Sequence, residues 1–155
     1  MTTSRGSNRL TTVCGLLNAA GVRYVIVGAF AAALHGHIRA TNDVDVLLEP
    51  ALPNVARALE ALTALPHGIA GEVDAAEVAA KPLTIIGDDP RVDLLTLAWS
   101  VRYADAAPNA QTVQIDGVTV PFADLDTLIR SKRTNRLQDQ ADVEELERLK
   151  KVGKG

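Results

Sequence analysis

The stretch that decides the fold is residues 24–49, which read YVIVGAFAAALHGHIRATNDVDVLLE. Its first four residues are β-branched or aromatic and are followed by Gly28, which predicts a short buried strand. The alanine-rich residues 29–34 predict a short helix, and Gly36 supplies its stop signal. Residues 43–49 first alternate between acidic and apolar side chains and then become apolar, which predicts a second strand. The stretch therefore predicts a strand, a helix and a strand in immediate succession.

The flanking sequence predicts further helices and two hairpins. Apolar residues recur at helical spacing in several segments, and two pairs of short apolar runs enclose turn-forming residues. The predicted helices are residues 10–20, residues 55–65 and two helices from Leu125 onward, the second over residues 137–151. The predicted hairpins join residues 83–86 to 92–96, and residues 113–115 to 118–120 across Asp116-Gly117. Residues 68–81 fit either a helix or a loop.

Length and composition predict one soluble globular domain. The chain has 155 residues, of which 47% are hydrophobic and 23% are charged, and these values are ordinary for such a domain. The order of the elements predicts the α/β (α+β) class, with a mixed sheet flanked by helices and further helices at the C-terminal end. We therefore expect residues 1–155 to form a single domain.

Charge, aromatic content and cysteine content argue against several functions. A net charge of −3 gives no general attraction to nucleic acid, and 3% aromatic residues argue against a base-stacking platform of several rings. The single cysteine, Cys14, excludes an intramolecular disulfide and a cysteine-rich zinc site. His35 and His37 have no third zinc ligand nearby, so we expect structural or helix-end roles for them. No apolar run approaches the roughly 20 residues that cross a bilayer, so we expect a cytoplasmic protein without membrane contact.

Three acidic residues are the strongest candidates for chemistry. Asp43 and Asp45 are two residues apart on a predicted strand, so their side chains project from the same face. Neighbouring carboxylates repel each other, and a magnesium ion would relieve that repulsion; a solvent-facing strand without metal is the alternative. Asp93 stands among apolar residues on a strand that we expect to pair near the acidic pair. It either forms an ion pair, with Arg91 or Arg39, or acts as a third metal ligand.

Residues near these acids are candidates for binding phosphate. Gly28 opens a helix, where free backbone N–H groups and the helix dipole favour an anion; a tight strand-to-helix turn is the alternative. Arg39 and Thr41 precede the acidic pair and are suited to contact phosphates. The alternative for Arg39 is a loop residue whose charge is solvated by water. Lys132 and Arg136 lie four residues apart on one helical face and are suited to close over a triphosphate. An exposed basic face is the alternative for these two residues.

Other polar and aromatic residues are given structural roles. Asp139 and Asp142 are expected to pair with nearby bases along their helix. Trp99 and Tyr103 lie at helical spacing, which favours packing over base stacking.

Taken together, these motifs resemble the polymerase β nucleotidyltransferase superfamily. Within it, the chain is similar to the minimal bacterial nucleotidyltransferases, including those of toxin–antitoxin and abortive-infection systems. The matching motifs are Val27-Gly28-Ala29, Leu34-His35-Gly36, Arg39, Thr41, Asp43-Val44-Asp45, Val92-Asp93-Leu94 and the C-terminal helical segment with Lys132, Arg136, Asp139 and Asp142. The combination is specific, whereas each motif alone is not.

The resemblance implies an enzyme that moves a nucleoside monophosphate from an NTP such as ATP to a hydroxyl group, with Mg²⁺ or Mn²⁺ as cofactor. It implies that Asp43, Asp45 and Asp93 hold the metal, and that Asp93 assists deprotonation of the acceptor. It also implies that Gly28 and Ala29 form the turn that holds the nucleotide phosphates. Ala29 stands where the family usually has Gly or Ser, so the backbone N–H is kept but a hydroxyl is absent.

Three kinds of acceptor for the nucleoside monophosphate are left open, namely an RNA such as a tRNA 3′ end, a protein hydroxyl and a small molecule such as an aminoglycoside. The resemblance also suggests a toxin component that an antitoxin partner restrains. The alternative function, which Ala29 favours, is a degenerate and non-catalytic nucleotidyltransferase-fold module that binds nucleotide or a partner protein.

Overall fold

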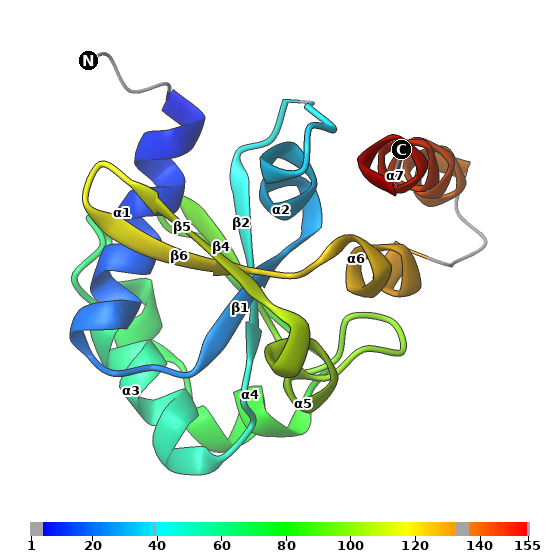
Figure 1. Ribbon diagram of the computed structural model, residues 1–155. Helices are drawn as coiled ribbons and strands as arrows, with labels where there is room; N and C mark the ends of the chain where they lie inside the picture. Colours follow the sequence, from blue (N-terminus) through cyan, green and yellow to red (C-terminus); the bar gives the residue numbers. More distant parts are fainter. Residues whose placement is uncertain (1–4, 39, 133–136, 155) are drawn as a thin grey trace.

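A six-stranded mixed sheet forms the centre of the computed structural model, which describes residues 5–38, 40–132 and 137–154 (Figure 1). The strands are β1 (Tyr24–Val27), β2 (Asp43–Leu48), β3 (Leu83–Ile86), β4 (Arg91–Leu95), β5 (Gln111–Ile115) and β6 (Val118–Phe122). The helices are α1 (Arg5–Ala19), α2 (Gly28–Leu34), α3 (Leu52–Leu62), α4 (Ala75–Ala80), α5 (Tyr103–Ala106), α6 (Leu125–Lys132) and α7 (Leu137–Lys154). Short 3-10 helices form at η1 (Ile69–Glu72) and η2 (Ala107–Asn109).

The two central strands of the sheet, β1 and β2, are neighbours and run in opposite directions. The order across the sheet is β3-β4-β2-β1-β6-β5, and β1 pairs antiparallel with β2. Strand β2 pairs in parallel with β4, because the chain passes from β2 through α3, η1 and α4 and then returns along the antiparallel strand β3 before it enters β4. Strands β3 and β4 form one antiparallel hairpin, and β5 and β6 form another. The acidic strand β2 is therefore flanked on both sides by other strands.

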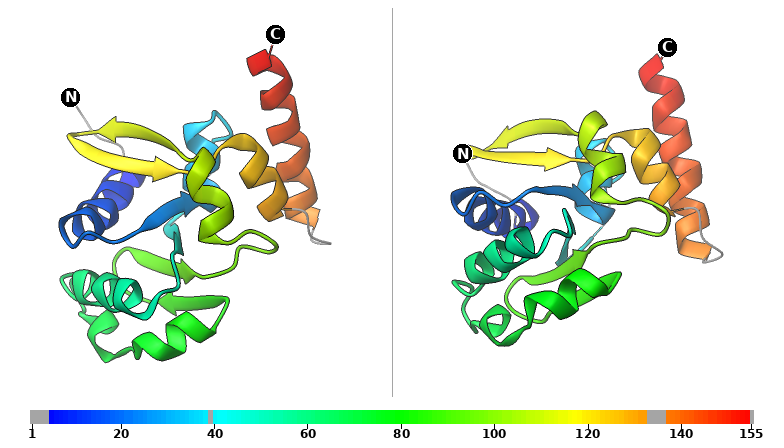
Figure 2. Two further views of the ribbon diagram at one scale, coloured as in Figure 1. Left: turned by 60° about the horizontal axis from the view of Figure 1, so that its bottom comes forward. Right: turned by 90° about the horizontal axis from the view of Figure 1, so that it is seen from below.

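The core lies mainly between the sheet and one layer of helices. Helices α1 and α3 lie together on one side, and α2, α6 and α7 gather on the other (Figures 1 and 2). Val44 and Val46 of β2 are fully buried, whereas Asp43 and Asp45, which alternate with them, are only partly buried. Because successive side chains of a strand point to opposite faces, one face of β2 packs into the core and the other carries carboxylates.

The α/β class, the mixed sheet, both hairpins and the predicted helices are confirmed. Asp116 and Gly117 have φ angles of 49° and 80°, as a two-residue hairpin turn with two positive φ values requires. Residues 68–81, which fitted either helix or loop, contain η1 and α4. Helix α3 spans Leu52–Leu62, so it begins and ends earlier than the predicted residues 55–65, and Pro53 lies in its first turn, where proline is tolerated. Within the described residues, no helix is long and apolar enough to cross a membrane.

Candidate functional site

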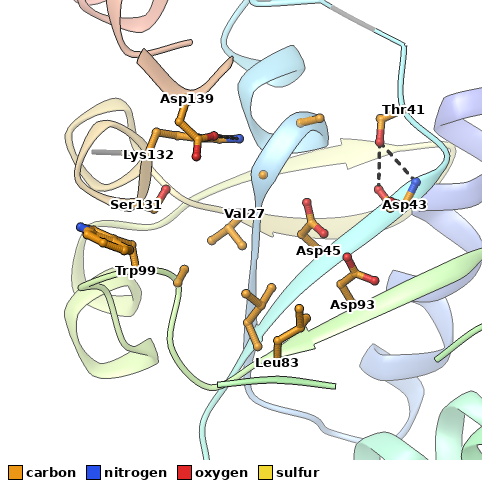
Figure 3. Close-up of a pocket in the computed structure, with 14 residues that line it drawn as sticks. Val27, Thr41, Asp43, Asp45, Leu83, Asp93, Trp99, Ser131, Lys132 and Asp139 are labelled. Atoms are coloured by element: carbon orange, nitrogen blue, oxygen red, sulfur yellow. Dashed lines mark hydrogen bonds and ion pairs between the residues drawn. The ribbon is translucent and has the colours of Figure 1, made fainter. Parts of the chain in front are cut away.

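The parallel pairing of β2 with β4 brings the three candidate acids onto one face of the sheet. Asp45 lies directly opposite Asp93 in the register, and Asp43 lies opposite Arg91. All three aspartates line a pocket of about 390 Å³ between the sheet and helices α2, α6 and α7. Figure 3 shows the carboxyl groups of Asp45 and Asp93 next to each other, with Asp43 farther along β2. The sequence predicted a shared face for Asp43 and Asp45 and a strand with Asp93 that pairs nearby, and the structure has all three on one face.

Arg91 is the main counter-ion of this acidic cluster. Its Nε donates to Asp93 Oδ1 at 2.9 Å, and a terminal guanidinium nitrogen donates to Asp93 Oδ2 at 3.2 Å. The same Nε lies 3.7 Å from Asp43 Oδ2. The hydrogen bond with Asp93, reinforced by the charge of that residue, raises the pKa of Arg91 above its usual range. Of the two roles that the sequence left open for Asp93, the ion pair with Arg91 is present in the structure.

The surroundings of Asp45 disfavour its charged form. Burial and the neighbouring charge of Asp93 raise the pKa of Asp45 from 3.8 to about 7, although Lys132 opposes this shift. Asp45 also lies directly against the backbone of Gly28. A Cβ atom added at Gly28 would lie 1.9 Å from Asp45 Oδ2, and Gly28 has a φ of 70°. Only glycine therefore fits the turn between β1 and α2 while Asp45 keeps its position.

The turn after β1 and the residue Thr41 complete the acidic side of the pocket. Gly28 and Ala29 both line the pocket, where β1 ends and α2 begins. Thr41 also lines it, and its Oγ1 accepts from the backbone N–H of Asp43 at 3.2 Å and donates to the Asp43 carbonyl at 3.3 Å. Thr41 thus fixes the start of β2. Arg39, which the sequence placed beside it, lies outside the described residues.

Lys132 lies at the opposite side of the pocket, within a buried network of charges. Its Nζ lies 3.5 Å from Asp139 Oδ1 and 3.3 Å from Asp142 Oδ2, and its side chain is only 15% exposed. His37 Nε2 lies 3.0 Å from Asp142 Oδ1. The alternative of an exposed basic face at Lys132 is therefore wrong, because helix α7 packs its aspartates over this residue. Arg136, the other half of the predicted pair, lies outside the described residues.

The contacts of the two aspartates of α7 and of the two histidines show the structural roles of these polar residues. Asp139 and Asp142 pair with a base, as predicted, but the base belongs to α6 rather than to their own helix. His35 Nε2 lies 2.8 Å from the Ala123 carbonyl oxygen, and the His35 ring packs edge-on against Phe122. Structural roles for the two histidines therefore agree with these contacts.

Trp99 is the pocket residue whose position the sequence predicted incorrectly. It lies in a tight turn before α5 and not in a helix, with a φ of 56°. Its side chain lines the pocket and the residue is 59% exposed, so the expectation of core packing is wrong for it. Tyr103, by contrast, packs against the core as expected. Helical spacing misled here because the Ala98–Val101 turn interrupts the segment.

The donor chemistry of the cluster fits a divalent cation. Carboxylate oxygens are ligands that Mg²⁺ prefers, and a cation beside Asp45 would favour its charged form, which burial and Asp93 disfavour. In the part of the chain that the structure describes, no three His, Cys, Asp or Glu side chains are arranged to hold a metal ion directly. Arg91 instead supplies positive charge to Asp93 and Asp43. Metal binding would thus require the Arg91 contacts to rearrange.

Comparison with known proteins supports the fold. No protein-family model and no curated protein matches the sequence. The chain is similar to the crystal structure of an antigenic nucleotidyltransferase-like protein from Paracoccidioides brasiliensis, with a TM-score of 0.57 and 16% sequence identity. The match covers 92% of this chain and 74% of that chain. A likeness at this identity concerns the fold alone, and it shows that the chain has a nucleotidyltransferase-like fold.

Proposed function

We propose that the protein is a metal-dependent nucleotidyltransferase that moves a nucleoside monophosphate from an NTP to a hydroxyl acceptor. The observation that carries this proposal is the convergence of Asp43, Asp45 and Asp93 in one pocket of a nucleotidyltransferase-like fold. A purely structural role would be better served by a neutral side chain at Asp45, because burial and repulsion from Asp93 penalise its charged form. Retaining an acid at this position is a cost that a function explains.

The three aspartates would hold Mg²⁺ or Mn²⁺ in this proposal. The cation, when bound, would neutralise charge on the phosphates and lower the pKa of the acceptor hydroxyl. Asp93 is the candidate to accept the proton of that hydroxyl. The acceptor oxygen would then form a bond to the α-phosphorus of the NTP while the bond from that phosphorus to the pyrophosphate leaving group breaks.

The other pocket residues would bind the nucleotide. Gly28 and Ala29 would bring backbone N–H groups to the phosphates, because no side chain at Gly28 fills the space beside Asp45. Lys132 lies close enough to influence the pKa of Asp45 and would act as a positive charge for the phosphates. Arg39, Thr41 and Arg136 remain candidate phosphate ligands on sequence grounds. Protein, tRNA and small-molecule acceptors, a cytoplasmic location, and a toxin role with an antitoxin partner remain proposals that rest on the resemblance.

One observation favours the alternative of a non-catalytic module. The guanidinium of Arg91 bonds both carboxylate oxygens of Asp93 and approaches Asp43, so a side chain of the chain itself supplies positive charge at this place. In a degenerate module this ion pair would be permanent and would substitute for a metal. The absence of a hydroxyl at Ala29 points in the same direction.

Transfer of labelled nucleotide distinguishes the two functions. The purified protein is incubated with each α-labelled NTP, with Mg²⁺ or Mn²⁺, and with a mixed pool of RNA and cell protein. An enzyme transfers label to RNA or protein, and Asp43→Ala, Asp45→Ala abolishes the transfer. Glu60→Gln, which changes an exposed acid on α3, serves as the matched control and should transfer label normally.

Calorimetric titration of the same protein with NTP completes the test. Metal-dependent NTP binding without label transfer would direct the search to small-molecule acceptors, which are then tested in the same assay. If neither transfer nor metal-dependent NTP binding occurs, the catalytic proposal is wrong and a non-catalytic module that binds a partner protein takes its place.

A further inference from the structure

The side chain of Trp99 lies at the end of the pocket opposite the three aspartates, as Figure 3 shows. Trp99 is the only tryptophan of the chain. Single exposed apolar residues are common on protein surfaces, so exposure alone indicates nothing. Two further observations make this residue unusual, namely the backbone that presents it and the chemistry of the pocket that it lines.

The backbone holds the indole away from the core. Ala98 and Val101 exchange two hydrogen bonds, of 2.8 Å and 2.9 Å, and close a tight turn with Trp99 inside it. Both anchors are buried, with exposed fractions of 7% and 0%. The φ of 56° at Trp99 belongs to a region that glycine or asparagine normally occupies and that a bulky side chain rarely adopts. A strained turn with buried anchors therefore presents a large apolar ring to solvent, in an orientation that the turn fixes.

The pocket is lined by both charged and apolar side chains. The three aspartates, Lys132 and Asp139 supply the charges, whereas Leu83, Leu95, Ala98 and Trp99 belong to the apolar lining. A nucleoside triphosphate needs both kinds of lining, because it combines a flat aromatic base with charged phosphates. The volume of about 390 Å³ falls within the range of small-molecule sites, roughly 300–1,000 Å³.

We propose that Trp99 is the residue on which the base of the bound nucleotide stacks. This inference rests on the proposed function, since it assigns the base end of the same nucleotide site. Stacking needs only one ring face per base, so the low aromatic content of the chain does not prevent it. Stacking is tolerant of base identity, and the larger purines gain more contact area than pyrimidines. Trp99 thus gives general affinity for nucleotides with a preference for purines.

Tryptophan fluorescence tests this contact directly, because all tryptophan emission of the protein comes from Trp99. The full-length protein is titrated with ATP, CTP and inorganic tripolyphosphate in the presence of Mg²⁺ or Mn²⁺, and binding of each is measured in parallel by calorimetry. We expect ATP to change the emission more than CTP does. Tripolyphosphate, which has no base, should bind without a comparable change.

Two variants separate stacking from packing. Trp99→Phe keeps an aromatic face, whereas Trp99→Ala removes it at the same backbone position. We expect Trp99→Ala to weaken ATP binding by about 5- to 150-fold, the range that base–aromatic stacking implies, while tripolyphosphate binding stays unchanged. Trp99→Phe should retain most of the ATP affinity. Thermal melts of both variants establish that they fold.

The outcomes distinguish this inference from the proposed function. If ATP binds without changing the emission, or if Trp99→Ala leaves its affinity unchanged, the stacking role is wrong and the nucleotide site remains. An equal loss of tripolyphosphate affinity in Trp99→Ala would also overturn it, because the residue would then support the whole pocket. If neither ATP nor tripolyphosphate binds to the parent protein with either metal, the proposed function is wrong together with this inference.

Discussion

Two pocket residues, Asp45 and Gly28, link the stability of the fold to the chemistry of the acidic cluster. Asp45 lies partly buried beside Asp93, and burial raises its pKa further than Lys132 lowers it. Gly28 has a positive φ and no space for a side chain, because Asp45 Oδ2 occupies the position of a Cβ atom. These two residues depend on each other. A side chain at Gly28 would displace the carboxylate that has the most perturbed pKa of the acidic cluster.

Gly28→Ala should therefore lower both stability and metal affinity. The added Cβ would force Asp45 to rotate, and the positive φ would cost further free energy, so we expect a loss of about 2 kcal/mol or more in the free energy of unfolding. Urea denaturation measures the stability, and calorimetry with Mn²⁺ measures the metal affinity. Gly15→Ala is the matched control, because nothing lies within 4 Å of its Cβ position in helix α1, and it should stabilise the protein slightly. Equal stabilities of the two variants would contradict this account of Gly28.

Asp45→Asn should make the metal-free protein more stable near neutral pH. The pKa of Asp45 is raised to about 7 in the folded protein, so between pH 3.8 and about 7 the folded state binds a proton that the unfolded state has lost. The free energy of unfolding therefore falls as pH rises through this window, and the loss is complete above it. Asparagine removes the effect, which a shift of this size puts at roughly 4 kcal/mol.

Chemical denaturation of the parent and of Asp45→Asn, in chelator and over a series of pH values, checks this expectation. The difference between them should be largest above pH 7 and should shrink toward pH 4. Glu60→Gln should follow the parent at every pH, because Glu60 is an exposed residue on α3. A pH-independent difference between parent and variant would show that Asp45 titrates normally.

Individual elements bring distant parts of the chain to the pocket. Helices α6 and α7 pack against each other, and Lys132 of α6 forms ion pairs with Asp139 and Asp142 of α7. His37, which follows α2, contacts Asp142 as well. This charge network therefore joins three helical regions at the wall of the pocket. Removing one buried member of such a network usually costs more than the net stability that the network contributes.

Lys132→Met should destabilise the protein through this network. The substitution keeps a similar length but leaves two buried aspartates without its positive charge, and we expect a loss of about 3 kcal/mol. Adding Asp139→Asn and Asp142→Asn to Lys132→Met should restore much of the stability. Thermal and urea denaturation of both variants provide the measurement. A triple variant as unstable as Lys132→Met alone would show that Lys132 contributes through packing and not through charge.

The whole molecule separates its core from its acidic face. The sheet buries Val44 and Val46 against one layer of helices, while the opposite face of the same strand lines the pocket. Strand pairing then adds Asp93 and Arg91 from β4 to that face. A ligand that relieves the repulsion among these acids is thus linked to the stability of the complete fold.

Mg²⁺ or Mn²⁺ should therefore raise the melting temperature of the parent protein. At a metal concentration 100 times the Kd, the gain is about 2.7 kcal/mol, provided that the unfolded chain does not bind the metal. Asp43→Asn, Asp45→Asn should show no metal-dependent shift. Differential scanning calorimetry with and without chelator makes the comparison, and K⁺ at equal ionic strength controls for general screening. Identical shifts in the parent and the double variant would place the metal elsewhere.

Much of the fold could be predicted because the deciding signals are local. The alternation of residues 43–49 predicted that Asp43 and Asp45 share a face, and Asp116-Gly117 predicted a hairpin that the structure confirms. The candidate site was predictable only in part. Trp99 carried a misleading helical spacing, and the pairing predicted for Asp139 and Asp142 did not identify Lys132 of another helix as the base.

By itself, the sequence determined which segments form strands and helices and which acids share one strand face, because backbone geometry relates residues that are close along the chain. The tertiary structure alone decided that Asp93 lies opposite Asp45, that Arg91 bonds Asp93, and that Trp99 faces the pocket. The strand contacts join residues that are far apart in the chain, and the position of Trp99 depends on a particular turn. The register of the strands follows from burying the apolar faces of strands and helices together, which no local pattern specifies.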